Sequence, residues 1–178
     1  MGRIVFVIGG ARSGKSSFAL KEASGIPGRK LYIATAEPLD KEMKERIERH
    51  KRERSSEWEV IEEPVDIASI LKKTGSYDVL LLDCLTLWVS NIKMRYQERE
   101  RQEDMFNGFV NALKEFKDSS DTDATLFAVS NEVGMGIVPQ NELARDFRDL
   151  SGLLNQRVAE MADEVYFVIA GIPLRIKY

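Results

Sequence analysis

An apolar run that leads directly into a glycine-containing loop constrains the fold of this chain more than any other feature. The run covers residues 4–8, and the loop that follows it reads Gly9-Gly10-Ala11-Arg12-Ser13-Gly14-Lys15-Ser16. A segment of helical character begins at the end of the loop, which gives the order of strand, loop and helix that the pattern G-x-x-x-x-G-K-[ST] requires. The glycines allow the backbone to curl so that successive N–H groups point inward at phosphate oxygens.

Two side chains at the end of this loop carry the predicted chemistry. We expect Lys15 to reach the β- and γ-phosphates of a nucleoside triphosphate and the Ser16 hydroxyl to bind Mg²⁺. The N-terminus of the following helix adds partial positive charge. A glycine-rich turn that binds no phosphate is the structural alternative, but the lysine, the serine and the flanking elements together disfavour it. The sequence therefore predicts that the chain binds a nucleoside triphosphate.

Size and composition limit the classes of protein to which the chain can belong. With 178 residues, 43% of them hydrophobic, residues 1–178 are expected to form a single nucleotide-binding domain. The net charge of −3 gives no basic excess, so we expect no nucleic-acid partner. No apolar run reaches the roughly 20 residues of a membrane helix, so we expect no stable membrane insertion. The single cysteine, Cys84, excludes an internal disulfide and fits a cytoplasmic protein.

Short apolar runs alternate with helical segments along the whole chain. The expected strands are Arg3–Ile8, Lys30–Thr35, Trp58–Glu62, Tyr77–Asp83, Ala124–Asn131, Glu164–Ala170 and Leu174–Lys177. The expected helices are Lys15–Ala23, Leu39–Arg54, Asp66–Lys73, Leu85–Met94, Gln97–Lys117 and Glu142–Ala162. The central runs are continuously apolar, which is typical of strands that a parallel sheet buries on both faces. We therefore expect a three-layer α/β fold with a mostly parallel sheet and a last strand that returns antiparallel in a hairpin.

An acidic residue ends one of the expected core strands. The run Tyr77–Asp83 has the form of a Walker B element, whose carboxylate holds magnesium directly or through water. A strand that ends in aspartate is common by chance, and only the accompanying phosphate loop makes this one informative. Asp83 could instead cap the helix that starts near Leu85, and the two interpretations are compatible.

The only histidine of the chain, His50, lies in a helix that is otherwise mostly charged. Its spacing places it on the same stripe as Leu39, Met43 and Ile47. From spacing alone, a packed structural imidazole is the simpler interpretation. A catalytic role is the competitor, because a ring with an unperturbed pKa of about 6.5 is largely neutral at physiological pH and approaches a triphosphate without charge repulsion. Attack on phosphorus would give a phosphoramidate that can pass its group to a second acceptor.

Further segments match one known family over nearly the whole length of the chain. Besides the phosphate loop they are Leu31–Thr35, Arg46-Ile47 with His50-Lys51, Asn131–Pro139, Ala144-Arg145 with Phe147–Asp149, Asn155–Arg157 and Ala162–Val165. The phosphate loop alone matches very many proteins, whereas Asn131–Pro139 together with the histidine helix is far more specific. On these residues the chain resembles the bifunctional adenosylcobinamide kinase / adenosylcobinamide-phosphate guanylyltransferase family of cobalamin biosynthesis.

The resemblance implies a RecA-like P-loop fold, a homotrimer and two reactions on corrinoid substrates. In the first reaction, the terminal phosphoryl group of ATP or GTP goes to a hydroxyl of adenosylcobinamide. In the second, the family's histidine, which aligns with His50, attacks the α-phosphorus of GTP and passes GMP to adenosylcobinamide phosphate. Lys15 and Mg²⁺ would stabilise the leaving group in both reactions.

The resemblance also implies a set of nucleotide-binding positions. They are Gly9, Gly10, Ala11, Arg12, Ser13, Gly14, Lys15, Ser16, Ala34, Thr35, Ala36, Lys51, Arg52, Glu53, Arg54, Glu62 and Asp83. Ser16 and Asp83 would hold the metal ion. Members of the family often carry glutamate where this chain has Asp83, which keeps the charge but shortens the side chain by one methylene.

Several alternatives stay open at the level of sequence. The loop 131–136 is either mobile against substrate or a tight turn, and Arg145, Arg148 and Arg157 either bind phosphate or pair with neighbouring acids. Trp58, Trp88 and the stripe 106–113 are expected in the core, with Trp88 the one to test for corrinoid contact. A small-molecule kinase with a structural His50 is the alternative function. A GTPase switch is disfavoured, because the chain has no Asn-Lys-x-Asp motif.

Overall fold

The computed structural model describes residues 1–53, 55–120 and 122–178. Its strands are β1 (Arg3–Gly9), β2 (Lys30–Ala34), β3 (Trp58–Glu62), β4 (Val79–Asp83), β5 (Thr125–Asn131), β6 (Glu164–Ile169) and β7 (Ile172–Lys177). Its helices are α1 (Lys15–Ser24), α2 (Lys41–Glu53), α3 (Ile67–Leu71), α4 (Leu85–Arg95), α5 (Arg99–Asp118) and α6 (Glu142–Met161). The predicted elements are thus all present, with bounds that differ by a few residues.

The seven strands form one sheet in the order β3-β2-β4-β5-β1-β6-β7. All neighbouring strands are parallel except β6 and β7, which confirms the mostly parallel sheet and the antiparallel hairpin at the end of the chain. In this register Gly9 pairs with Asn131, Asp83 with Ala34, and Ala34 with Glu62. Because parallel strands end at the same edge of a sheet, the last residues of β1 to β5 come together there.

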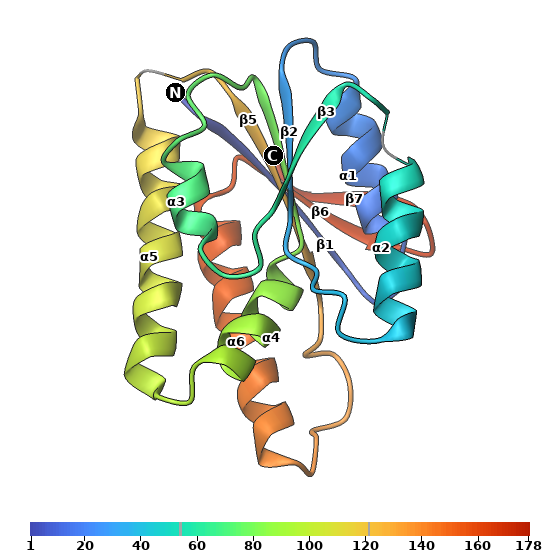
Figure 1. Ribbon diagram of the computed structural model, residues 1–178, viewed down its shortest axis with the longest axis vertical. Helices are drawn as coiled ribbons and strands as arrows, with labels where there is room; N and C mark the ends of the chain where they lie inside the picture. Colours follow the sequence, from blue (N-terminus) through green and yellow to red (C-terminus); the bar gives the residue numbers. More distant parts are fainter. Residues whose placement is uncertain (54, 121) are drawn as a thin grey trace.

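Helices cover both faces of the sheet (Figure 1). On one face α1 packs its buried Ala19 and Ala23 against β1, β4 and β5, while α3 to α6 cover the other face. Trp88 of α4 and Phe109 of α5 are buried on this second face of the sheet. The Trp88 indole N–H donates to the carbonyl oxygen of Val65 at 2.6 Å. The core prediction for Trp88 is thereby confirmed. Among the described residues no helix is both apolar enough and long enough to cross a membrane.

Helix α2 lies beside α1 and packs only loosely on the rest of the chain (Figure 1). Among its described side chains none is buried, and Met43, Ile47 and His50 are half-buried. The prediction that Leu39 belongs to this helix and its stripe is wrong. Asp40 accepts the N–H of Met43 at 2.7 Å and so caps the helix, which begins at Lys41, while Leu39 stays exposed.

The loop after β5 is held at its start by two hydrogen bonds of Glu132. The Glu132 carboxylate accepts the N–H of Gly134 at 2.5 Å, and the Glu132 N–H donates to the carbonyl of Gly9 at 3.0 Å. Farther along, Arg145 donates to the carbonyl oxygens of Pro139 and Gln140 at 3.0 and 2.5 Å. This guanidinium therefore holds the end of the loop, which is a third role beside the two that the sequence left open.

Replacing Gly9 by alanine is expected to destabilise the start of the phosphate loop. An added Cβ would lie 2.5 Å from the carbonyl oxygen of Val168 and 2.7 Å from the Ser13 hydroxyl. Because the carbonyl belongs to the backbone of β6, the strands must shift, and we expect Gly9→Ala to lower the free energy of unfolding by about 2 kcal/mol. Urea denaturation measures the difference.

Gly10→Ala is the matched control, since nothing lies within 4 Å of its added Cβ. We expect its free energy of unfolding to stay within about 0.5 kcal/mol of the parent value. Equal losses in the two variants would contradict the close approach of Gly9 to β6 as the cause.

Candidate active site

The phosphate loop has the conformation of an anion cradle. Arg12 and Gly14 adopt positive φ angles of 56° and 92°, and the N–H of Ser13 donates to the carbonyl of Gly10 at 3.2 Å. The turn between β6 and β7 supports the loop from behind, where the N–H of Gly171 donates to the carbonyl of Ser13 at 2.8 Å. Lys15 is buried, and its ammonium group donates to the carbonyl of Gly10 at 3.2 Å. The phosphate loop therefore curls around the ammonium group of Lys15.

A hydroxyl and a carboxylate are in contact beside the phosphate loop, at the carboxyl edge of the sheet. The Ser16 hydroxyl donates to Asp83 Oδ1 at 3.3 Å, which joins the first turn of α1 to the end of β4. The cap residue of α4 is Cys84, so Asp83 is not the helix cap that the sequence left open. Mg²⁺ prefers oxygen ligands and commonly takes one or two from the protein and others from substrate phosphates. The donor set of Ser16 and Asp83 fits this ion.

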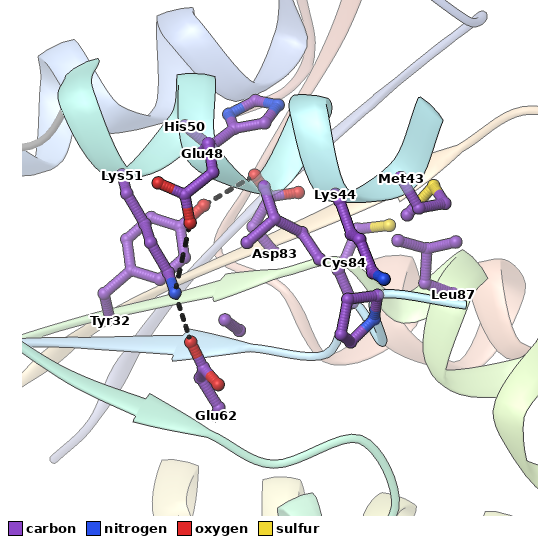
Figure 2. Close-up of a pocket in the computed structure, with 14 residues that line it drawn as sticks. Tyr32, Met43, Lys44, Glu48, His50, Lys51, Glu62, Asp83, Cys84 and Leu87 are labelled. Carbon is purple, nitrogen blue, oxygen red and sulfur yellow. Dashed lines mark hydrogen bonds and ion pairs between the residues drawn. The ribbon is translucent and has the colours of Figure 1, made fainter. Parts of the chain in front are cut away.

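The structure also shows a contact that the sequence analysis missed. The Tyr32 hydroxyl donates to the second carboxylate oxygen of Asp83, Oδ2, at 2.8 Å (Figure 2). A signal was present, because Tyr32 lies two residues before Ala34, and strands β2 and β4 pair Ala34 with Asp83. Only the strand order, however, reveals that β2 and β4 are neighbours.

Two hollows flank α2, and His50 lines both. The first, of about 500 Å³, lies between the phosphate loop and the helix and is lined by Arg12, Gly14, Lys15, Ser16, Ser17, Glu42, Glu45, Arg49 and His50. The second, of about 350 Å³, lies between the helix and the ends of β2, β3 and β4. His50 thus borders both the polar hollow at the phosphate loop and the pocket at the ends of the strands.

The second hollow combines apolar walls with ion pairs of Lys51 (Figure 2). Met43, Ile47 and Leu87 supply the apolar walls. The Lys51 ammonium pairs with the Glu62 carboxylate at 2.9 Å and lies 3.8 Å from Glu48. A flat apolar ring with hydrogen-bonding edges suits such a pocket, and the carboxylate of Glu62 is one of the acceptors that line it.

The comparison with known proteins decides the family. A family model described as CobU, cobinamide kinase / cobinamide phosphate guanyltransferase, matches residues 5–176. The chain belongs to this family. The expected resemblance is confirmed, and the protein is a transferase.

Proteins with curated names agree with the family. The chain is 37% identical to the bifunctional adenosylcobalamin biosynthesis protein CobP of Pseudomonas aeruginosa, over 96% of this chain and 95% of that one. It is 37% identical to the bifunctional adenosylcobalamin biosynthesis protein CobU of Escherichia coli, over 98% and 99% of the two chains. The CobU protein of Salmonella typhimurium is 38% identical over the same shares.

Solved structures with little sequence identity share the fold. The model is similar to a prototypical ATPase of a type III secretion system, with a TM-score of 0.61 and 9% identity over 97% of this chain and 56% of that one. It is also similar to the ATPase EscN of enteropathogenic E. coli, with a TM-score of 0.60 and 10% identity over 95% and 43% of the two chains. The expected three-layer P-loop fold is confirmed.

The structure brings most of the nucleotide-binding positions expected from the CobU family to one edge. The loop 9–16, Ala34, Ala36, Glu62 and Asp83 lie there with α2 beside them, and Arg52 is exposed near the end of α2. Glu53 is the last residue of that helix, and Arg54 lies outside the described residues. Their contacts with a nucleotide stay predictions.

Thr35 differs from the other expected positions because it has no exposed surface. Its hydroxyl donates to the carbonyl of Cys84 at 2.7 Å and accepts the N–H of Cys84 at 2.8 Å. Its own carbonyl accepts from Asn91 at 2.7 Å. The side chain therefore fastens the segment after β2 to the residue that follows Asp83, behind the pocket surface.

Thr35→Val is expected to destabilise this fastening. The nearly isosteric valine leaves a buried N–H without its acceptor, so we expect a loss of about 2 kcal/mol in the free energy of unfolding. Thr35→Ser keeps the hydroxyl and should lose clearly less in the same urea titration. If serine and valine cost the same, the hydrogen bonds to Cys84 do not carry the effect.

Proposed function

We propose that the chain carries out both reactions of its family with one phosphate loop. It would transfer the terminal phosphoryl group of ATP or GTP to adenosylcobinamide, and then GMP from GTP to adenosylcobinamide phosphate. The second product is adenosylcobinamide-GDP. Residues 1–178 would act as one nucleotide-binding domain.

One observation carries the proposal: His50 lines both the hollow at the phosphate loop and the pocket that ends at Glu62. In a nucleoside triphosphate the α-phosphate lies between the base and the β- and γ-phosphates. With the terminal phosphates on Lys15 and the base beside Glu62, the α-phosphorus falls between the two hollows. A nucleophile for the α-phosphorus in this pose would lie near His50, which supports the proposal.

The chemistry of the guanylyl step follows from this placement. A neutral ring nitrogen of His50 attacks the α-phosphorus, a P–N bond forms, and the P–O bond to the β-phosphate breaks. Pyrophosphate leaves with its charge held by Lys15 and the loop N–H groups. The corrinoid phosphate then attacks the same phosphorus and releases the ring. In the kinase step the substrate hydroxyl attacks the γ-phosphorus instead, and the same groups hold the nucleoside diphosphate that leaves.

The pocket also supports a preference for guanine in the second step. Guanine presents two neighbouring N–H donors on one edge, and a carboxylate accepts both. Glu62 is exposed at the pocket wall, and its carboxylate already pairs with the Lys51 ammonium group at 2.9 Å. We expect guanine to replace Lys51 at Glu62.

Mg²⁺ would be held by Ser16 and Asp83, and when bound it neutralises the charge on the β- and γ-phosphate oxygens. The corrinoid is the proposed partner, and a homotrimer in the cytoplasm is the proposed assembly and location. The strongly exposed Met135 and Ile137, in the loop after β5, support a contact with a large apolar partner near the site edge.

His50→Ala tests the proposal against a kinase that lacks guanylyl transfer. Incubation of the parent protein with [α-³²P]GTP and Mg²⁺ should give a covalent label that acid removes and alkali does not. Because the chain has one histidine, His50→Ala should abolish the label. Its phosphoryl transfer should stay within about threefold, since the ring does not bind the attacking hydroxyl.

Label that survives acid, or label that persists in His50→Ala, would contradict a histidine-bound intermediate. Loss of phosphoryl transfer together with the label would instead show that His50 supports the fold or the nucleotide site in general. Binding of GTP to the variant separates that outcome from a chemical role.

A further inference from the structure

Tyr32 holds one of the two oxygens of Asp83. The side chain is only 3% exposed, and its hydroxyl donates to Asp83 Oδ2 at 2.8 Å. The other oxygen, Oδ1, accepts from the Ser16 hydroxyl at 3.3 Å. The carboxylate is therefore bound at both oxygens, by the tyrosine that lines the pocket (Figure 2) and by the serine of the phosphate loop.

The hydroxyl of Tyr32 is itself fixed in position. The ring packs edge-on against Trp58, with centroids 6.1 Å apart and an interplanar angle of 84°. The backbone after Asp83 is fixed as well, because Thr35 binds both the N–H and the carbonyl of Cys84. The remaining freedom of Asp83 lies in its two side-chain torsions, and the second of them, which rotates the carboxyl group, has only a broad preference of its own.

We propose that Tyr32 is a positioning residue that turns the Asp83 carboxylate so that Oδ1 faces Ser16 and the metal ion. The proposal rests on the magnesium site that the proposed function assigns to Ser16 and Asp83. By occupying Oδ2, Tyr32 leaves one defined oxygen for the ion or for a water bound to it. Groups that orient metal ligands in this way commonly change metal affinity by 10- to 100-fold when they are removed.

A purely structural role for Tyr32 makes a different prediction. Tyr32 also lines the 350 Å³ pocket, so a side chain that only forms the pocket wall would affect nucleotide binding whether or not metal is present. A positioning role affects the dependence on Mg²⁺ and leaves metal-free binding unchanged. The two roles are separated by a titration of binding, without any measurement of turnover.

The test is the binding of mant-GTP, followed by fluorescence, in EDTA and across a range of Mg²⁺ concentrations. We expect Tyr32→Phe to bind mant-GTP in EDTA like the parent protein and to need about tenfold more Mg²⁺ for half of the metal-dependent gain in affinity. Phenylalanine keeps the ring that packs on Trp58, and a thermal melt checks that the fold is retained. A Mg²⁺ midpoint equal to that of the parent, or an equal loss of affinity with and without Mg²⁺, would overturn the proposal.

Tyr77→Phe is the matched control. The Tyr77 hydroxyl donates to Glu59 at 2.7 Å, and this hydrogen bond raises the pKa of Tyr77, so the substitution removes the same kind of bond. Tyr77 lies just before the start of β4, whereas Asp83 is the last residue of that strand, so the two sites are at opposite ends of β4. We expect its Mg²⁺ midpoint to equal that of the parent protein, and a shift like that of Tyr32→Phe would overturn the proposal.

Asp83→Asn gives a second test, because the effect of Tyr32 must act through that carboxylate. In the Asp83→Asn background, Tyr32→Phe should produce no further shift of the Mg²⁺ midpoint, and an additive shift would overturn the proposal. If the mant-GTP affinity of the parent protein does not depend on Mg²⁺, both the proposed metal site and the role of Tyr32 are contradicted. If Tyr32→Phe shifts the Mg²⁺ midpoint but no label forms on His50, only the guanylyl transfer is contradicted.

Discussion

The shared edge at which six parallel strands end is the constraint on which the site depends. It places the start of the phosphate loop, at Gly9, within two strands of Asp83, although 74 residues separate them in sequence. The contact of Ser16 with Asp83 then closes the distance between α1 and β4 at 3.3 Å. Without the parallel register, neither the oxygen pair nor the pocket beside it would exist.

The N-terminal part of this arrangement could be predicted from sequence. The run 4–8, the loop and Lys15 form a local unit whose pattern determines its conformation, and the continuous apolar run that ends in Asp83 marks a buried strand. The antiparallel return of β7 followed from the turn residues before it. These features depend on neighbours in the chain, which is why the pattern was sufficient.

The parts that could not be predicted depend on contacts between distant segments. No sequence pattern indicates the order of the strands, so the pairing of β2 with β4 and the hydrogen bond from Tyr32 to Asp83 were missed. The hydrogen bonds of the Thr35 hydroxyl to the backbone of Cys84 were missed for the same reason, and the nucleotide contact expected at Thr35 from the family stays a prediction. The start of α2 was missed because the cap at Asp40 outweighs the apolar Leu39 before it.

In the proposed function one cradle serves two reactions, which accounts for the placement of the proposed nucleophile on α2. Both leaving groups would carry their charge on phosphates held by the loop and Lys15, so only the attacking group has to differ. Helix α2 lies between the two hollows and none of its described side chains is buried, so it would supply the attacking group from the side. His50 is suited to the task, since a neutral ring nitrogen meets less repulsion from a triphosphate than an anionic nucleophile does.

A crystal structure with Mg²⁺ and the analogue GMPCPP, whose α–β bridge cannot be cleaved, tests the central claim most directly. The account predicts that the terminal phosphates lie in the loop 9–16 and that a ring nitrogen of His50 lies about 3–3.5 Å from the α-phosphorus, opposite the bridging carbon. A triphosphate seated in the loop with the ring of every His50 in the assembly beyond contact with the α-phosphate would contradict it.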